Sequence, residues 1–148
     1  MTESDVSAIA RTFERWHKPA GQYEAYYAEQ VRGERDVLLA RFEGEIVGYV
    51  TLLASSGYAP FREQGIPEIA DLNVIGEHQH KGIGSALIRE AEHQARMRGS
   101  AAVGIAVEQS PAYAAANRLY PYLGFRPDGL GVTPSDNELH LLKPLREY

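Results

Sequence analysis

Cysteine is absent from this 148-residue chain. Its absence excludes disulfide bonds, thiol nucleophiles and cysteine-ligated zinc or iron–sulfur sites, and it suits a reducing compartment. Long apolar runs are missing too: the longest, residues 46–54, is too short to cross a bilayer as a helix. Residues 1–10 also lack the basic and apolar blocks of a signal peptide. We therefore expect a cytoplasmic protein with no role in a membrane.

Positive charge is in deficit. The chain has 15 lysines and arginines against 20 aspartates and glutamates, which gives a net charge of −5. This balance disfavours nucleic acid as a partner and favours a cationic one, which the protein would attract electrostatically. The length and the 44% of hydrophobic residues are typical of one globular domain, and no repeat or linker divides the sequence. We expect a single domain over residues 1–148.

Apolar periodicity predicts alternating helices and strands. The expected helices cover residues 3–17, 21–33, 82–98 and 110–124. The expected strands cover residues 36–42, 45–54, 67–75, 101–108 and 139–145, with a hairpin turn at Glu43-Gly44. Residues 55–65 are expected to form a loop, and residues 126–137 an irregular stretch that leads to the last strand. This order predicts an α/β protein in which helices pack on a mixed sheet.

The stretch "HQHKGIG" brings two glycines to the start of the third helix. A helix N-terminus with free N–H groups favours an anion. A P-loop would place its lysine after the glycines, whereas Lys81 precedes Gly82, and a dinucleotide fingerprint would have glycine where Leu87 stands. Two interpretations remain: the pattern Q/R-x-x-G-x-G/A, which Gln79, Gly82 and Gly84 satisfy, or a tight turn that binds nothing.

The order of motifs favours the first interpretation. The strand "IPEIADLNV" with the turn "HQHKGIG", and then "ANRLYPYLGF" at 116–125, resemble the two signatures of the GCN5-related N-acetyltransferase (GNAT) superfamily. The resemblance covers nearly the whole chain and is least specific over residues 1–35. It implies a central, mostly antiparallel sheet splayed at the cofactor strand, with helices on both faces. It also implies transfer of an acetyl group from acetyl-CoA to a primary amine, and the absence of cysteine favours direct attack over an acyl-enzyme intermediate. The alternative is a noncatalytic acyl-CoA-binding regulatory module of the same fold.

The resemblance also implies where the cofactor binds. Backbone N–H groups of the glycine turn would hold the pyrophosphate of coenzyme A, and the pantetheine arm would pair with the preceding strand where a bulge splays the sheet. Family members often carry an asparagine about seven residues before the signature tyrosine, but here Tyr113 stands there and the nearest asparagine is Asn117. The cofactor-binding residues implied are Leu72, Asn73, Val74, Gln79, His80, Lys81, Gly82, Ile83, Gly84, Ser85, Asn117 and Tyr120. No metal is expected: Glu77 adjoins the pair His78 and His80, but no H-E-x-x-H motif is present and further ligands would have to come from elsewhere in the chain.

Three catalytic roles follow from the same resemblance. Tyr120 stands where the family commonly places the acid that protonates the departing sulfur, and the backbone N–H of Leu72 would stabilise the oxyanion. Glu68 matches the position of the basic glutamate in histone-acetyltransferase relatives. Simple alternation places Glu68 and Leu72 on one face of the strand and Asp71 on the other. Asp71 becomes the competing base if a bulge shifts the register, and a chain of water molecules is a third possibility.

The acceptor is a small-molecule or peptide amine whose identity the sequence leaves open. The family builds its acceptor site from the second helix and from the loop at residues 55–66. The substrate-binding residues expected there are Tyr23, Tyr26, Tyr27, Tyr58, Phe61 and Asp71. The oligomeric state is also left open, with a homodimer among the alternatives.

Overall fold

A computed structural model describes residues 1–145, and the last three residues of the expected domain, 146–148, lie outside the described residues. The helices are α1 (Asp5–Thr12), α2 (Gln22–Val31), α3 (Ala59–Glu63), α4 (Ile83–Met97) and α5 (Ala114–Tyr122). The strands are β1 (Arg35–Phe42), β2 (Glu45–Leu53), β3 (Glu68–Val74), β4 (Ala102–Glu108), β5 (Arg126–Thr133) and β6 (Glu138–Pro144). No described helix is long and apolar enough to cross a membrane.

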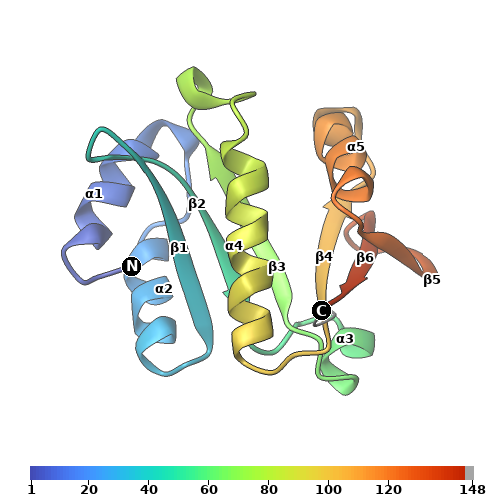
Figure 1. Cartoon of the computed structure of the whole chain (residues 1–148). Coiled ribbons are helices and arrows are strands. Elements are labelled where there is room, and N and C mark those ends of the chain that lie inside the picture. Colours follow the sequence, from blue (N-terminus) through green and yellow to red (C-terminus); the bar gives the residue numbers. More distant parts are fainter. Residues whose placement is uncertain (146–148) are drawn as a thin grey trace.

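The strands form one mixed sheet in the order β1-β2-β3-β4-β6-β5. Every neighbouring pair is antiparallel except β3 and β4, which run parallel. Helix α4 lies across one face of the sheet, while α1 and α2 lie on the other, as Figure 1 shows. The expected fold, a mostly antiparallel mixed sheet with helices on both faces, is therefore confirmed.

Helix α4 illustrates how the sequence determines this packing. Its apolar residues recur every four positions, which places them on one side of the helix. Leu87, Ala91 and Ala95 are buried and join a core with the β2 and β3 residues Val50 and Ile69. The helix ends at Met97, close to the predicted boundary.

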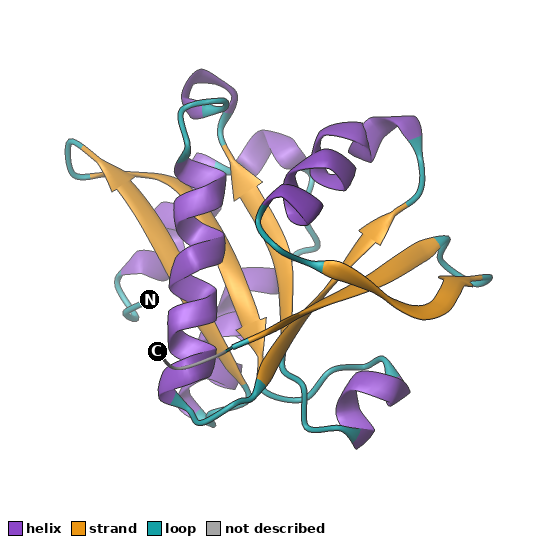
Figure 2. Cartoon of the chain, turned by 45° about the vertical axis from the view of Figure 1, so that its right-hand side comes forward, coloured by secondary structure: helices purple, strands orange, loops and turns teal. Residues whose placement is uncertain are grey.

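The sheet splays open between β3 and β4. These two strands pair only at Glu68↔Gly104 and Ile69↔Ile105 and then separate, while β4 stays paired with β6 along its other edge. Figure 2 shows the two strands diverging toward α5. On the other side of β3, the register with β2 shifts between Ala70 and Asn73. Asp71 and Leu72 together oppose a single residue of β2, which is a β-bulge. The bulge and the splay that the family resemblance implied are both present.

The bulge corrects the predicted alternation of β3. Asp71 adopts a left-handed backbone with φ of 57° and inserts one extra residue into the strand. Leu72 therefore packs with Ile69 in the core beneath α4, and Asp71 contacts Tyr49 on the opposite face. The prediction that Glu68 and Leu72 share one face is therefore wrong, because the side-chain period of two fails wherever an extra residue is inserted.

Three predicted boundaries also differ from the structure. The first helix ends at Thr12, and a short 3-10 turn over Glu14–Trp16 follows it. The loop at residues 55–65 contains α3. Phe61 anchors this helix by packing its ring against Gly104, where a Cβ on residue 104 would clash with the ring. The stretch expected to be irregular is largely the edge strand β5, whose pairing with β6 is interrupted between Pro127 and Val132.

Candidate active site

The splay produces a cleft that passes between the two faces of the sheet. On the α4 side it is a groove of about 630 Å³, a size within the range of about 300–1,000 Å³ that is typical of small-molecule sites. A second groove opens on the side of α1 and α2. Both grooves include Leu72, Val74, Gln79 and Tyr120 in their walls, so they form one continuous cleft.

The N-terminus of α4 forms one wall of this cleft. No described side chain caps the helix, and its first backbone hydrogen bond there runs from the Ala86 N–H to the Gly82 carbonyl at 3.0 Å. The N–H groups of the first turn are therefore free to bind a ligand, and the helix dipole favours an anionic one. Gly82 has a φ of 83° with open space around its Cα. A phosphate group can approach this backbone closely.

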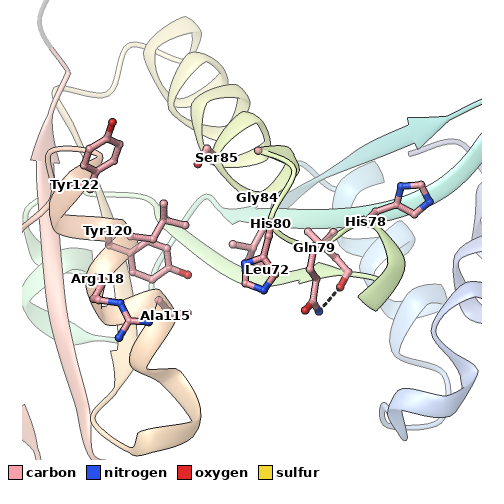
Figure 3. Close-up of a pocket in the computed structure, with 14 residues that line it drawn as sticks. Leu72, His78, Gln79, His80, Gly84, Ser85, Ala115, Arg118, Tyr120 and Tyr122 are labelled. Atoms are coloured by element: carbon pink, nitrogen blue, oxygen red, sulfur yellow. Dashed lines mark hydrogen bonds between the residues drawn. The ribbon is translucent and has the colours of Figure 1, made fainter.

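The structure brings together most of the residues predicted to bind the cofactor. The α4-side groove is lined by Leu72, Val74, Gln79, His80, Gly82, Gly84, Ser85 and Tyr120 from the predicted set. Asn73 lines the other side of the cleft. Gln79 is held in the turn by a hydrogen bond from its side-chain amide to the Val74 carbonyl at 2.9 Å, which is visible in Figure 3.

Three predicted cofactor residues do not line the cleft. Lys81 is exposed at the turn, and Ile83 packs against the core. The Asn117 side chain donates to the carbonyls of Glu108 and Tyr113 at 3.1 and 2.9 Å, so it ties α5 to the end of β4. Their predicted contacts with the cofactor remain predictions.

Tyr120 extends from α5 into the cleft. Its hydroxyl points across the groove toward the β3–α4 wall, whereas Tyr122 lies at the rim of the groove with its hydroxyl pointing in another direction (Figure 3). Burial, with a smaller contribution from Tyr113, raises the pKa of Tyr120 to about 12. The phenol therefore keeps its proton at neutral pH and has the protonation state that a general acid needs.

Asp71 lies on the other side of the cleft at the centre of a hydrogen-bond network. Its carboxylate accepts hydrogen bonds from Tyr26 at 2.9 Å, Tyr49 at 2.8 Å and Asn73 at 2.7 Å, and it forms an ion pair with Lys18 at 2.9 Å. Burial opposes ionisation, but the bonds from Asn73, Lys18 and Tyr49 prevail and hold the pKa of Asp71 below its ordinary value. The cleft thus carries a fixed negative charge beside Leu72.

Glu68, the predicted base, lies at the start of β3, where β3 and β4 are still paired. Its carboxylate accepts a hydrogen bond from the Ser56 hydroxyl at 2.6 Å. It is not among the residues that line either described groove. The structure therefore places Asp71, rather than Glu68, next to Leu72.

The aromatic residues expected to contact the acceptor form two groups. In the first, Tyr23 and Tyr26 surround Asp71, Tyr26 directly and Tyr23 through the Tyr49 hydroxyl at 3.2 Å. Tyr27 is half-buried on the same helix. The second group lies near α3. There the ring of Tyr58 stacks on that of His140, with 3.5 Å between the ring centroids, and Phe61 packs edge-on against Tyr58. The predicted role of both groups in acceptor binding stays a prediction.

Sequence reasoning missed three charged residues of the cleft: Lys18, Glu108 and Glu138. Glu108 and Glu138 face each other as a pair across β4 and β6. Burial, together with the neighbouring carboxylates of Asp136, Glu68 and Glu108, raises the pKa of Glu138 to about 7. No sequence motif marks these residues, because strand pairing and loop placement alone bring them to the cleft.

Comparison with solved structures identifies the architecture. An N-acetyltransferase from Staphylococcus aureus Mu50 superimposes with a TM-score of 0.77 at 17% identity, covering 99% of this chain and 96% of that one. A ribosomal-protein-alanine N-acetyltransferase from Brucella melitensis gives 0.74 at 23% identity, with 98% and 97% coverage. An aminoglycoside 6'-N-acetyltransferase complexed with coenzyme A gives 0.69 at 17% identity, with 97% and 89% coverage. These three similarities show the fold.

The sequence itself identifies the family. No curated protein sequence matches this chain. The profile of the Acetyltransferase (GNAT) family, however, matches residues 4–125. This range includes the bulged strand β3, the glycine turn that begins α4, and Tyr120. The chain therefore belongs to the GNAT family of acetyltransferases.

Proposed function

We propose that residues 1–148 act as one N-acetyltransferase domain that moves an acetyl group from acetyl-CoA to a primary amine by direct attack. One observation carries the proposal: the free N-terminus of α4 and the Tyr120 hydroxyl face the same cleft, which the bulge in β3 opens. An anion site for the cofactor and a proton donor for its sulfur thus lie on opposite walls of one groove.

In this proposal the backbone holds the cofactor. The N–H groups near Gly82 and Gly84 bind the pyrophosphate, and the pantetheine arm lies along the edge of β3 that β4 has left unpaired. The coenzyme A bound to the aminoglycoside 6'-N-acetyltransferase supports this use of the fold. The thioester carbonyl then lies beside Leu72, whose N–H stabilises the oxyanion as charge develops on it.

Acetyl transfer also requires proton movement at two atoms. The acceptor ammonium loses a proton before its nitrogen attacks the thioester carbon, and the departing thiolate takes a proton from Tyr120. Of the candidate carboxylates, Asp71 is held ionised by its hydrogen bonds and is therefore a weak proton acceptor. Glu138 lines the cleft and has a pKa of about 7. We therefore assign the base to Glu138 and the binding of the acceptor ammonium to Asp71.

The pH dependence of catalysis tests the assignment of Glu138. A base with a pKa of about 7 must be deprotonated to act, so kcat/KM should fall as the pH drops below about 7. Glu138→Gln should remove this acidic limb and lower kcat/KM by about 10²–10⁴-fold. Asp136→Asn should shift the limb to lower pH, because the Asp136 carboxylate helps to raise the pKa of Glu138.

The matched control for Asp136 is Asp128, another carboxylate of the β5–β6 region. It accepts a hydrogen bond from Tyr58 at 2.6 Å and is not among the main groups that raise the pKa of Glu138. Asp128→Asn should therefore leave the acidic limb in place. An unchanged profile in both Glu138→Gln and Asp136→Asn would show that another group, or water, removes the proton.

The proposed activity is tested directly with an amine panel. Wild-type protein is mixed with acetyl-CoA and with small amines, polyamines, aminoglycosides and peptides, and release of free coenzyme A is measured. The carboxylates of Asp71, Glu108 and Glu138 in the cleft favour cationic acceptors. Tight binding of acetyl-CoA without turnover on any amine would favour the alternative, a noncatalytic acyl-CoA-binding module.

A further inference from the structure

The cleft already contains a primary amine of this chain. Lys18 lies between the 3-10 turn Glu14–Trp16 and α2, and its side chain extends to Asp71. Its Nζ donates to the Asp71 Oδ1 at 2.9 Å, and the two side chains are only 22% and 21% exposed. Lys18 lines the same side of the cleft as Leu72 and Tyr120. Its amine thus occupies the position assigned above to the ammonium of the acceptor.

The surroundings of Asp71 allow this amine to leave the ion pair. Tyr26, Tyr49 and Asn73 donate to the same carboxylate, so its charge remains hydrogen-bonded when Lys18 moves. A buried carboxylate that depended on one partner would resist that movement, because an unpaired buried charge is costly. Asp71 therefore positions the Lys18 amine, but the Asp71 carboxylate does not depend on Lys18 for its hydrogen bonds.

We propose that Lys18 is a self-acetylation site of this protein. The inference rests on the proposed function, because it uses the same cofactor and the same proton donor. The Lys18 ammonium loses one proton to solvent, and its free amine attacks the carbonyl carbon of acetyl-CoA. The C–N bond forms, the C–S bond breaks, and the thiolate takes a proton from Tyr120, which solvent then reprotonates. The products are Nε-acetyl-Lys18 and free coenzyme A.

The other two lysines of the chain provide internal controls. Lys81 is exposed at the glycine turn, so it reports the rate of uncatalysed modification by acetyl-CoA. Lys143 is paired with Glu92 at 3.0 Å and lies outside the cleft. Uncatalysed acetylation by acetyl-CoA should modify the exposed lysine, Lys81, fastest. Enzymatic self-transfer should instead select Lys18.

The test incubates full-length protein with acetyl-CoA, without an added amine, and follows each lysine by peptide mass spectrometry. We expect acetylation of Lys18 ahead of Lys81 and Lys143, with a first-order rate constant that does not change with protein concentration. Tyr120→Phe should slow it by about 10²–10⁴-fold, because the thiolate loses its acid. Self-acetylation of wild-type protein should release coenzyme A before any acceptor amine is added. Lys18→Arg keeps the positive charge beside Asp71 but removes the reactive amine, so it should abolish this release.

Five outcomes would overturn the inference. If wild-type protein acetylates an added amine while Lys18 stays unmodified, self-acetylation is excluded and the proposed function stands. If Lys81 reacts as fast as Lys18, or if Tyr120→Phe does not slow Lys18, the modification is uncatalysed. If the rate constant rises in proportion to protein concentration, one molecule modifies another. If acetyl-CoA does not bind at all, the inference and the proposed function both fail.

Discussion

Replacing Tyr120 by phenylalanine should lower kcat by about 10²–10⁴-fold, the usual contribution of a general acid, while the Kd for acetyl-CoA stays within a few-fold. The substitution removes only the hydroxyl that faces the groove and keeps the ring against Phe125. Because the pKa of Tyr120 is raised to about 12, the wild-type phenol remains protonated across the physiological range. Steady-state kinetics with a responsive amine, together with calorimetric titration of acetyl-CoA, measure the two quantities separately.

Tyr122 is the matched control for this substitution. It lies on the same helix at the rim of the groove, but it is 85% exposed and its hydroxyl does not face the β3–α4 wall. Tyr122→Phe should therefore leave both kcat and Kd at wild-type values. If Tyr120→Phe turned over at the wild-type rate, water or another group would be the acid, and the assignment of Tyr120 would be wrong.

The second large effect is expected at Gly82. Gly82→Val should raise the Kd for acetyl-CoA by at least about 100-fold, or about 2.7 kcal/mol. A valine at a φ of 83° is strained and either distorts the turn or places its methyl groups where the phosphates would lie. Hydrogen bonds to charged groups contribute about 1.5–3 kcal/mol each, so the loss of two accounts for this effect. Isothermal titration calorimetry measures it.

Gly99, just beyond the other end of α4, separates binding from strain. Its φ is 82°, and no atom lies within 4 Å of the position that a Cβ would occupy, as at Gly82. Gly99→Val should therefore lower the melting temperature about as much as Gly82→Val but leave acetyl-CoA binding intact. Equal loss of affinity in both variants would show that the backbone around Gly82 does not hold the cofactor. Tighter binding of ATP than of acetyl-CoA would contradict the proposed ligand.

Local elements of the fold could be predicted because they depend on patterns within a few residues. The four-residue spacing of Leu87, Ala91 and Ala95 predicts α4, and Glu43-Gly44 predicts the β1–β2 hairpin. Helix α3 was missed because its five residues are too few to show a period, and Phe61 is held by a distant contact with Gly104. Short elements of this kind depend on tertiary packing for their stability.

The sequence by itself determined the family, the glycine turn at the start of α4 and the position of Tyr120, since each is a short motif read in order along the chain. Only the tertiary structure decided which charges share the cleft with that tyrosine. Lys18 and Asp71 are 53 residues apart in sequence, and Glu138 reaches the cleft through its pairing with Glu108. The bulge at Asp71 reverses the alternation expected along β3. Contacts between distant segments set these features, and no local pattern encodes them.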